Sequence, residues 1–149
     1  MNELKQVLVV CQSTQECRKA VRFGTMMAEK FGSELSVLHT YHNVFGLEGW
    51  NLPIPKQMVE DGYQQMLDET KKKIGQMVKA AREKGIKVEV LVREGKLIDE
   101  LFKLVEAEKI DLLVLPSHPE WRLEHFFFGR ENEAILRKLP CSVTFVNEQ

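Results

Sequence analysis

Polar residues able to take part in chemistry follow two apolar runs of the chain. Gln12, Ser13 and Thr14 come after the first run, and His118 and His125 lie in the segment after another. Catalysis needs a titratable group or nucleophile with a partner in hydrogen-bond reach. The first segment offers no such pair, and the two histidines have no Cys or acidic partner at zinc-site spacing. The sequence therefore predicts no catalytic residue and no metal site, and it favours solvated loop histidines.

The three cysteines, Cys11, Cys17 and Cys141, are odd in number and form no Cys-x-x-Cys motif. Their spacing predicts neither a disulfide framework nor a zinc site, which favours a reducing cytoplasm. Cys11 and Cys141 are expected to be small buried hydrophobic residues. A redox or small-ligand sensor is a weaker alternative, and the reactivity of the native thiols would test it.

The composition is that of an ordinary globular protein with one domain over residues 1–149. The chain has 149 residues, 44% apolar and 29% charged, with a formal net charge of -1. This near-neutral charge argues against binding nucleic acid through its phosphates. The apolar runs are far shorter than the roughly 20 residues that cross a bilayer, and the N-terminal run is too short for a signal peptide. We therefore expect a cytoplasmic protein without a membrane or nucleic-acid partner.

Strand-like and helix-like segments alternate along the chain. A Ser-x-x-Glu capping box at Ser13 and Glu16 predicts the start of the first helix, and Gly32 predicts its end. The segment at 42–55 contains glycines and prolines without periodicity and predicts a loop. The other assignments follow from apolar periodicity. Strands are predicted at 7–11, 35–41, 86–92, 111–115 and 142–146, and further helices at 56–84, 97–105 and 130–138.

This alternation predicts a single-domain α/β fold, a doubly wound parallel sheet of five strands with four main helices. Such sheets bind ligands at the carboxyl ends of their strands. The relevant loops follow Cys11, Val92 and Leu115. Ser13 at the first of these is more simply explained as a helix cap than as a catalytic residue.

A helix N-terminus after Gly129 offers a second kind of site. Its amide groups and dipole favour an anion, and Arg130 adds a guanidinium. Glu131 and Glu133 lie in the same first turn, where acidic residues commonly stabilise the helix dipole. Ordinary helix capping is therefore favoured over a phosphate or sulfate site.

Five segments in order resemble the universal stress protein superfamily over essentially the whole chain. They are V-L-V-V-C-Q-S-T, F-G-S-E-L-S-V-L-H, V-R-E-G, D-L-L-V-L-P-S and G-R-E-N-E-A-I-L-R-K-L-P-C-S-V-T-F-V. The resemblance implies a Rossmann-like sheet of strand order 3-2-1-4-5. It also implies a cytoplasmic stress-response protein that acts with protein partners the sequence does not identify.

The family divides into members that bind ATP and members that do not. The resemblance places the ATP-binding motif, Gly-x2-Gly-x9-Gly-Ser/Thr, at Pro116, Pro119, Gly129 and Arg130, and the family's adenine-contacting Asp at Gln12. Only Gly129 matches. Proline fixes φ and has no N–H for a phosphate. Losing three charge-assisted contacts of about 1.5 to 3 kcal/mol each weakens a micromolar site to about millimolar or worse.

We therefore expect the subclass that lacks the ATP motif, with no cofactor and no catalysis. The alternative is an adenine-nucleotide switch, conceivably with slow ATPase activity, that binds ATP or AMP weakly in a non-standard loop. The residues that would bind a nucleotide or anion in that case are Gln12, Ser13, Ser117, Gly129 and Arg130.

The last strand lies at the edge of the sheet in the order that the resemblance implies. Apolar residues at such an edge favour pairing with another chain, and two-fold self-pairing is the usual outcome. We expect a homodimer through antiparallel pairing of this strand. Its interface would comprise Ser142, Val143, Thr144, Phe145 and Val146.

Overall fold

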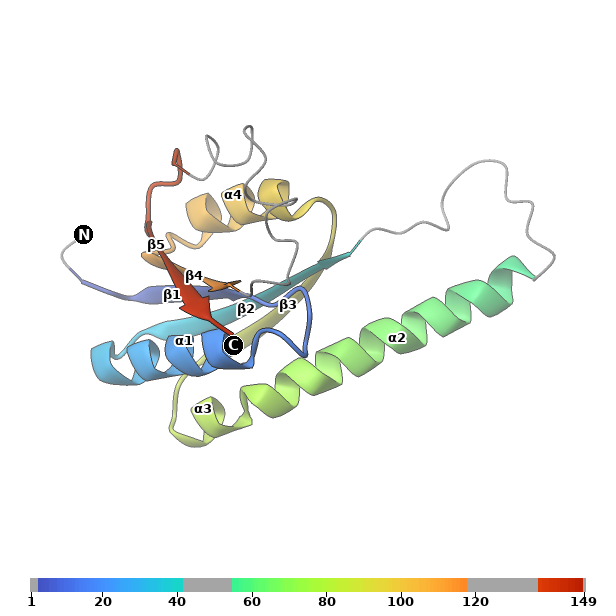
Figure 1. The fold of residues 1–149 in the computed structure, drawn as a ribbon, viewed down its shortest axis with the longest axis horizontal. Coiled ribbons are helices and arrows are strands. Elements are labelled where there is room, and N and C mark those ends of the chain that lie inside the picture. Colours follow the sequence, from blue (N-terminus) through green and yellow to red (C-terminus); the bar gives the residue numbers. More distant parts are fainter. Residues whose placement is uncertain (1–2, 42–54, 118–136, 149) are drawn as a thin grey trace.

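The structure is a computed structural model that describes residues 3–41, 55–117 and 137–148. Within these ranges the chain forms five strands and four helices, and Figure 1 shows their arrangement. The strands are β1 (Gln6–Val10), β2 (Glu34–Tyr41), β3 (Val88–Glu94), β4 (Leu112–Ser117) and β5 (Ser142–Asn147). The helices are α1 (Arg18–Phe31), α2 (Lys56–Met77), α3 (Lys79–Glu83) and α4 (Leu97–Ala107).

All strand pairs are parallel, and their order is β3-β2-β1-β4-β5. This confirms the predicted Rossmann-like α/β sheet and its strand order. In the central strand β1, Val7, Leu8, Val9 and Val10 are all fully buried. A strand buried on both faces reads as a continuous apolar run, which is why the sequence alone revealed it.

Alternate side chains of β1 enter two separate hydrophobic cores. Val7 and Val9 pack with residues of α1, α2 and α3, whereas Leu8 and Val10 pack with residues of α4. Figure 1 accordingly shows α4 on one side of the sheet and the other three helices on the opposite side. Because successive side chains of a strand point to opposite faces, one five-residue strand anchors both helical layers.

Two glycines of α1 have definite roles. Gly32 has a left-handed backbone (φ 66°), and its N–H donates to Ala28 O, which confirms the predicted helix end. Gly24 faces β1 so closely that a Cβ atom there would lie 2.5 Å from Cγ2 of Val9. The helix can therefore approach the sheet only without a side chain at this position. Phe31, the last residue of this helix, is 58% exposed.

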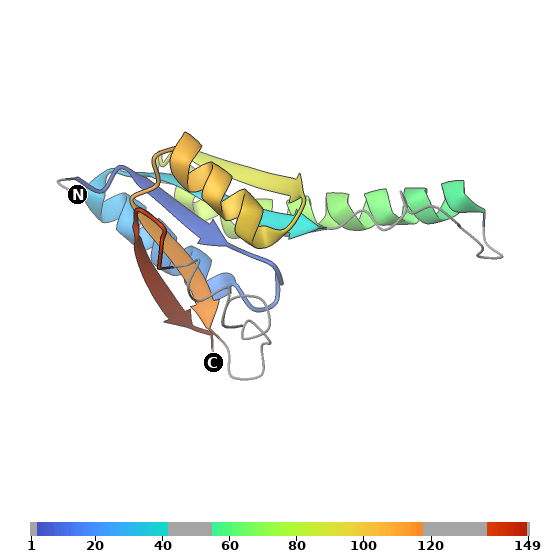
Figure 2. The same cartoon turned by 90° about the horizontal axis from the view of Figure 1, so that it is seen from above.

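The predicted continuous helix at 56–84 is wrong, since the chain breaks at Val78 into α2 and α3. Val78 and Ala81 are both fully buried in the core that also holds Ile74. The break redirects the chain so that the short α3 packs on the sheet. The first half of α2 extends past the sheet (Figure 2), and Met66 in this helix is 51% exposed.

Several predicted boundaries move by a few residues. β3 runs from Val88 to Glu94 and not from 86 to 92, and β4 continues through Pro116 to Ser117. The predicted loop at 42–55 lies outside the described residues up to 54, and Pro55 precedes α2. Of the predicted helix at 130–138, residues 130–136 lie outside the described ranges, and Arg137 and Lys138 form a turn.

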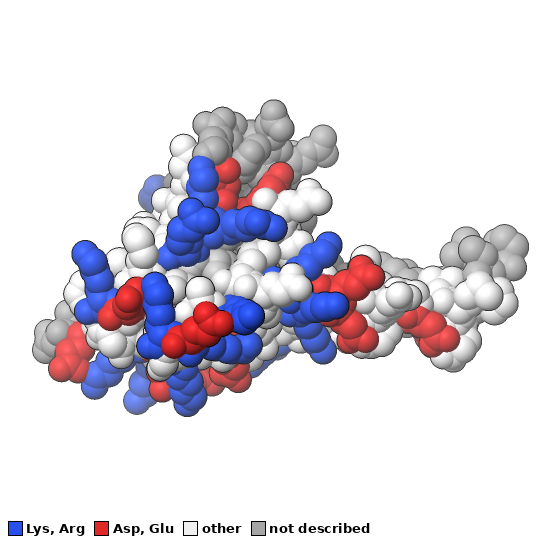
Figure 3. Space-filling view, turned by 90° about the horizontal axis from the view of Figure 1, so that it is seen from below, with Lys and Arg blue, Asp and Glu red and all other residues white. Residues whose placement is uncertain are grey.

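Charges of both signs are mixed on the surface. Figure 3 shows Lys and Arg interspersed with Asp and Glu on the side of α1, α2 and α3. Lys84 pairs there with Glu29 at 3.0 Å. In the described part of the chain, none of the helices has the length and apolar character needed to cross a membrane.

Candidate functional site

The connection between β1 and α1, residues 12–16, forms the first wall of the site. We call it the β1–α1 loop. The N–H of Glu16 donates to Ser13 O at 3.0 Å, so the loop contains a tight turn. The helix begins only at Arg18, after Cys17, and the capping residue makes no side-chain hydrogen bond. The predicted capping box at Ser13 and Glu16 is therefore not used.

The carboxylate of Glu148, the residue that follows β5, caps α1 in its place. Its carboxylate accepts hydrogen bonds from the backbone N–H groups of Lys19 at 3.0 Å and Ala20 at 2.6 Å. The N–H of Glu148 in turn donates to Ser117 O at 2.9 Å, which fixes the segment after β5 beside the end of β4. A carboxylate at this position satisfies free amide groups and complements the positive end of the helix dipole. Sequence analysis missed this residue because its partners lie far away in the sequence.

Both ends of the Gln12 side-chain amide form hydrogen bonds with Thr40, near the end of β2. The amide Nε2 of Gln12 donates to Oγ1 of Thr40 at 2.7 Å and to its carbonyl at 3.4 Å. The Oε1 of Gln12 accepts from the N–H of Thr40 at 2.8 Å. Both ends of the amide are therefore engaged within the protein, at the position where the resemblance places an adenine contact.

His39 lies beside this pair. Its Nδ1 donates to the carbonyl of Cys11 at 2.8 Å. His39 is half-buried and is not fully enclosed in the core. It lines a cavity of about 350 Å³ at the ends of β1 and β2. The other lining residues are Gln12, Ser13, Thr14, Gln15, Met66 and Thr70.

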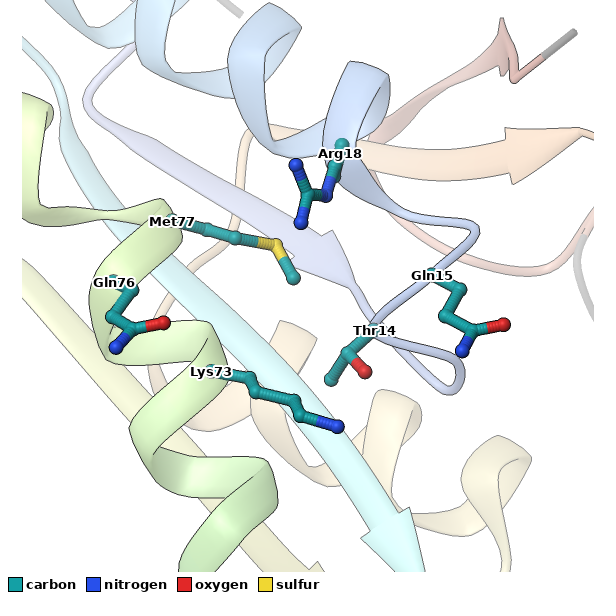
Figure 4. Close-up of a pocket in the computed structure, with 6 residues that line it drawn as sticks. All are labelled: Thr14, Gln15, Arg18, Lys73, Gln76 and Met77. Atoms are coloured by element: carbon teal, nitrogen blue, oxygen red, sulfur yellow. The ribbon is translucent and has the colours of Figure 1, made fainter.

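A second cavity of about 410 Å³ lies between the β1–α1 loop and α2. Figure 4 shows the side chains of Arg18 in α1 and Lys73 in α2 pointing toward the space between these two helices. Thr14 lies at the edge of this space. Its lining is completed by Gln15, Gln76 and Met77. Thr14 and Gln15 line both cavities, so the conformation of the loop shapes both.

Cys11 and Cys17 are joined by a disulfide, which corrects the expectation that no disulfide forms. Their Cα atoms lie 5.3 Å apart, within the range that disulfides span. The turn in the β1–α1 loop produces this proximity, which a count of cysteines does not reveal. Both residues are fully buried, as expected for Cys11. The free thiol of Cys141 is half-buried, and this burial, with the nearby Asp111 carboxylate, raises its pKa.

The structure brings together only part of the predicted binding set. Gln12 and Ser13 share the β1–α1 loop and line one cavity. Ser117 is exposed at the end of β4 and is not among the described residues that line either cavity. Gly129 and Arg130 lie outside the described residues, as do His118 and His125. Within the described ranges, no three His, Cys, Asp or Glu side chains gather as a metal site.

The predicted interface residues lie on β5, which is at the edge of the described sheet beside β4. Ser142 and Phe145 are exposed, and Phe145 retains 45% of its accessible surface. Val143, Thr144 and Val146 are half-buried. The strand thus presents a mixed apolar and polar surface next to the Glu148 cap.

Comparisons with known proteins agree with this architecture. A universal stress protein from Aquifex aeolicus is 28% identical over 128 residues, which is 78% of this chain and 86% of that protein. The solved structure of universal stress protein UspA from Lactobacillus plantarum superposes with a TM-score of 0.72 at 14% identity, covering 98% of this chain and 99% of that one.

The structure of an Archaeoglobus fulgidus universal stress protein in complex with dAMP is also similar. Its TM-score is 0.60 at 17% identity, and the match covers 97% of this chain and 98% of that one. The model of the universal stress protein family matches residues 3–147. This match covers nearly the whole sequence, and the sheet has the strand order that the resemblance implied. The chain therefore belongs to the universal stress protein family.

Proposed function

We propose that this stress-response protein acts through contacts with other proteins, without catalysis and without high-affinity ATP binding. The observation that carries the proposal is the Gln12–Thr40 pairing, in which both ends of the Gln12 amide are already bonded. A nucleobase that approached this position would have to displace those hydrogen bonds, each contributing about 1 kcal/mol.

The end of β4 supports the same proposal. Pro116, at the first glycine position of the ATP motif, is buried within β4 and lies opposite Val146 of β5. A proline there offers no N–H to a phosphate and has little conformational freedom. This chain belongs, in our proposal, to the subclass without the ATP-binding motif.

An adenine-nucleotide switch is the second candidate function, and the cavity of about 350 Å³ favours it. Ser13, Thr14 and His39 supply hydroxyl and ring-nitrogen groups there, and the cavity is at the low end of the volumes that hold small ligands. The similar Archaeoglobus fulgidus protein was solved with dAMP. Weak binding of AMP or ATP would use this cavity through Gln12 and Ser13, which line it. Of the other candidate contacts, Ser117 lies at the end of β4 outside the lining, and Gly129 and Arg130 lie outside the described residues.

Calorimetric titration separates the two functions. The purified full chain is titrated with ATP and Mg²⁺, and separately with AMP, while the Archaeoglobus fulgidus protein is titrated with dAMP as a control for the assay. We expect no saturable heat from this chain at micromolar nucleotide. Stoichiometric binding in the micromolar range would overturn the proposal and establish the nucleotide switch.

A homodimer through β5 is part of the proposed function. The half-exposed Phe145 and the edge position of β5 support it, because an apolar edge strand readily pairs with a second copy. Light scattering during gel filtration should give twice the mass of 17.3 kDa. A monomer at tens of micromolar protein would contradict it. A cytoplasmic location also stays a prediction.

A further inference from the structure

Four observations meet at the β1–α1 loop. The disulfide between Cys11 and Cys17 closes a covalent ring around it. The capping box of Ser13 and Glu16 is present in the sequence, but α1 begins at Arg18. An Oε2 atom of Glu16 is buried and has no hydrogen-bond partner among the described residues. The amide groups that a longer helix would use are occupied by the distant Glu148.

The ring holds the loop in a form that is incompatible with the capping box. With the Cα atoms of Cys11 and Cys17 only 5.3 Å apart, five residues must leave the strand and return. In a capping box the N–H of Glu16 donates to the hydroxyl of Ser13, but in the observed turn it donates to Ser13 O at 3.0 Å. Gln12 is meanwhile held at the other end by Thr40. The disulfide therefore favours the observed turn and leaves the carboxylate of Glu16 without its capping partner.

We propose that Cys11 and Cys17 are a redox-active pair whose state decides where α1 begins. In the disulfide form α1 begins at Arg18, as observed. In the dithiol form the helix extends back by one turn, with Ser13 as the capping residue. The Glu16 carboxylate then accepts from the N–H of Ser13, which completes the capping box.

The longer helix also releases the C-terminal segment. In a continuous α-helix the N–H of Lys19 donates to Gln15 O and that of Ala20 to Glu16 O, following the i to i−4 pattern. These are the two N–H groups that Glu148 now binds. Both sets of hydrogen bonds cannot form together. The state of the cysteine pair is thereby coupled to the residue that follows β5 and to Thr14 and Gln15, which line both cavities.

The chemistry is thiol–disulfide exchange with a low-molecular-weight thiol such as glutathione. For reduction, one glutathione thiolate attacks a sulfur of the pair and forms a mixed disulfide, and a second releases oxidised glutathione. Two electrons pass to the protein, and each released sulfur takes up one proton. Oxidation reverses these steps. Because both cysteines are fully buried, exchange proceeds through transient opening of the loop. The switch goes beyond the proposed function and requires neither a nucleotide nor a dimer.

The test compares the full wild-type chain in oxidised and in reduced glutathione buffers. Alkylation under denaturing conditions, followed by mass spectrometry, should find one free thiol in the oxidised form, Cys141, and three in the reduced form. Backbone NMR should show helical Cα shifts at 14–17 only in the reduced form, with changed amide shifts at Lys19 and Ala20. Three free thiols in every buffer, or unchanged shifts at 14–17 on reduction, would overturn the proposal.

Variants separate the switch from general effects of the buffer. Cys17→Ala should show the long helix in both buffers, whereas Cys141→Ala should respond as the wild type does. Glu16→Ala should retain the disulfide but lose most of the helical extension on reduction. Non-helical shifts at 14–17 in a folded Cys17→Ala protein would contradict the proposal. If that variant does not fold, the comparison of the wild-type protein in the two buffers still decides the question.

Discussion

The side chain of Gln12 pairs with the backbone of Thr40 much as another strand residue would. Its Oε1 accepts the N–H of Thr40 at 2.8 Å, and its Nε2 donates to the hydroxyl of the same residue at 2.7 Å. The pairing lies two positions beyond Val10 and Leu38, the last paired residues of β1 and β2. It therefore anchors the β1–α1 loop at its first residue.

Replacing Gln12 by Ala should lower the free energy of unfolding by about 1 to 3 kcal/mol, because the buried N–H of Thr40 loses its acceptor. Urea denaturation in an oxidised buffer measures the change. Gln15→Ala is the control, since Gln15 is exposed on the same loop and should change stability by less than about 0.5 kcal/mol. Equal effects of the two substitutions would contradict the anchoring role of Gln12.

Removing the Glu148 carboxylate should destabilise α1. Glu148→Ala removes the acceptor for Lys19 and Ala20, and loss of a capping group costs about 0.5 to 2 kcal/mol. Glu148→Gln keeps an acceptor but not the charge, so its smaller loss should shrink further as salt screens the helix dipole. Thermal unfolding of the oxidised protein measures both. Glu106→Gln, on the exposed face of α4, should have no measurable effect.

A methyl group at Gly24 should destabilise the protein through overpacking. The added Cβ atom would lie 2.5 Å from Cγ2 of Val9 and 3.2 Å from Cδ1 of Leu35, both in the core. We expect Gly24→Ala to cost about 1 to 3 kcal/mol in urea denaturation. Gly62→Ala in α2 is the matched control, because nothing lies within 4 Å of its added Cβ atom. This control should stabilise the helix by about 0.5 to 1 kcal/mol, and the opposite ranking would refute the packing argument.

A charge on the exposed face of β5 should weaken the proposed dimer. Phe145→Lys replaces an apolar side chain that is 45% exposed with one that discourages edge pairing. Light scattering should show a shift toward monomer, while circular dichroism retains the folded signal. Phe31→Lys is the control, since Phe31 is a 58% exposed phenylalanine at the end of α1 and is not one of the predicted interface residues. Dimerisation that survives Phe145→Lys but not Phe31→Lys would place the interface elsewhere.

Alkylation of Cys141 in the native oxidised protein should be slow near neutral pH. Burial and the nearby Asp111 carboxylate raise the pKa of its thiol, so less of the reactive thiolate is present at a given pH. The rate with iodoacetamide should therefore rise only at a higher pH than for the same residue in urea. Identical pH profiles in the native and unfolded protein would contradict the raised pKa.

Local patterns were sufficient for most of the sheet. The central strand is apolar at every position because both of its faces are covered, and Gly32 ends α1 through its own backbone conformation. Both features depend on residues close together in the sequence. The ordered motifs along the whole chain indicated the family, and with it the order of the strands.

The site depends on contacts that no local pattern contains. The capping box of Ser13 and Glu16 predicts a helix start that does not form. A disulfide holds the loop in another conformation, and the carboxylate of Glu148, 128 residues away from Ala20, caps the helix instead. Gln12 finds its partner 28 residues later, on a neighbouring strand. A local motif specifies which hydrogen bonds a segment is able to form. Only the folded chain decides which competing partner occupies those groups, because burial and chain crossing bring distant donors and acceptors together.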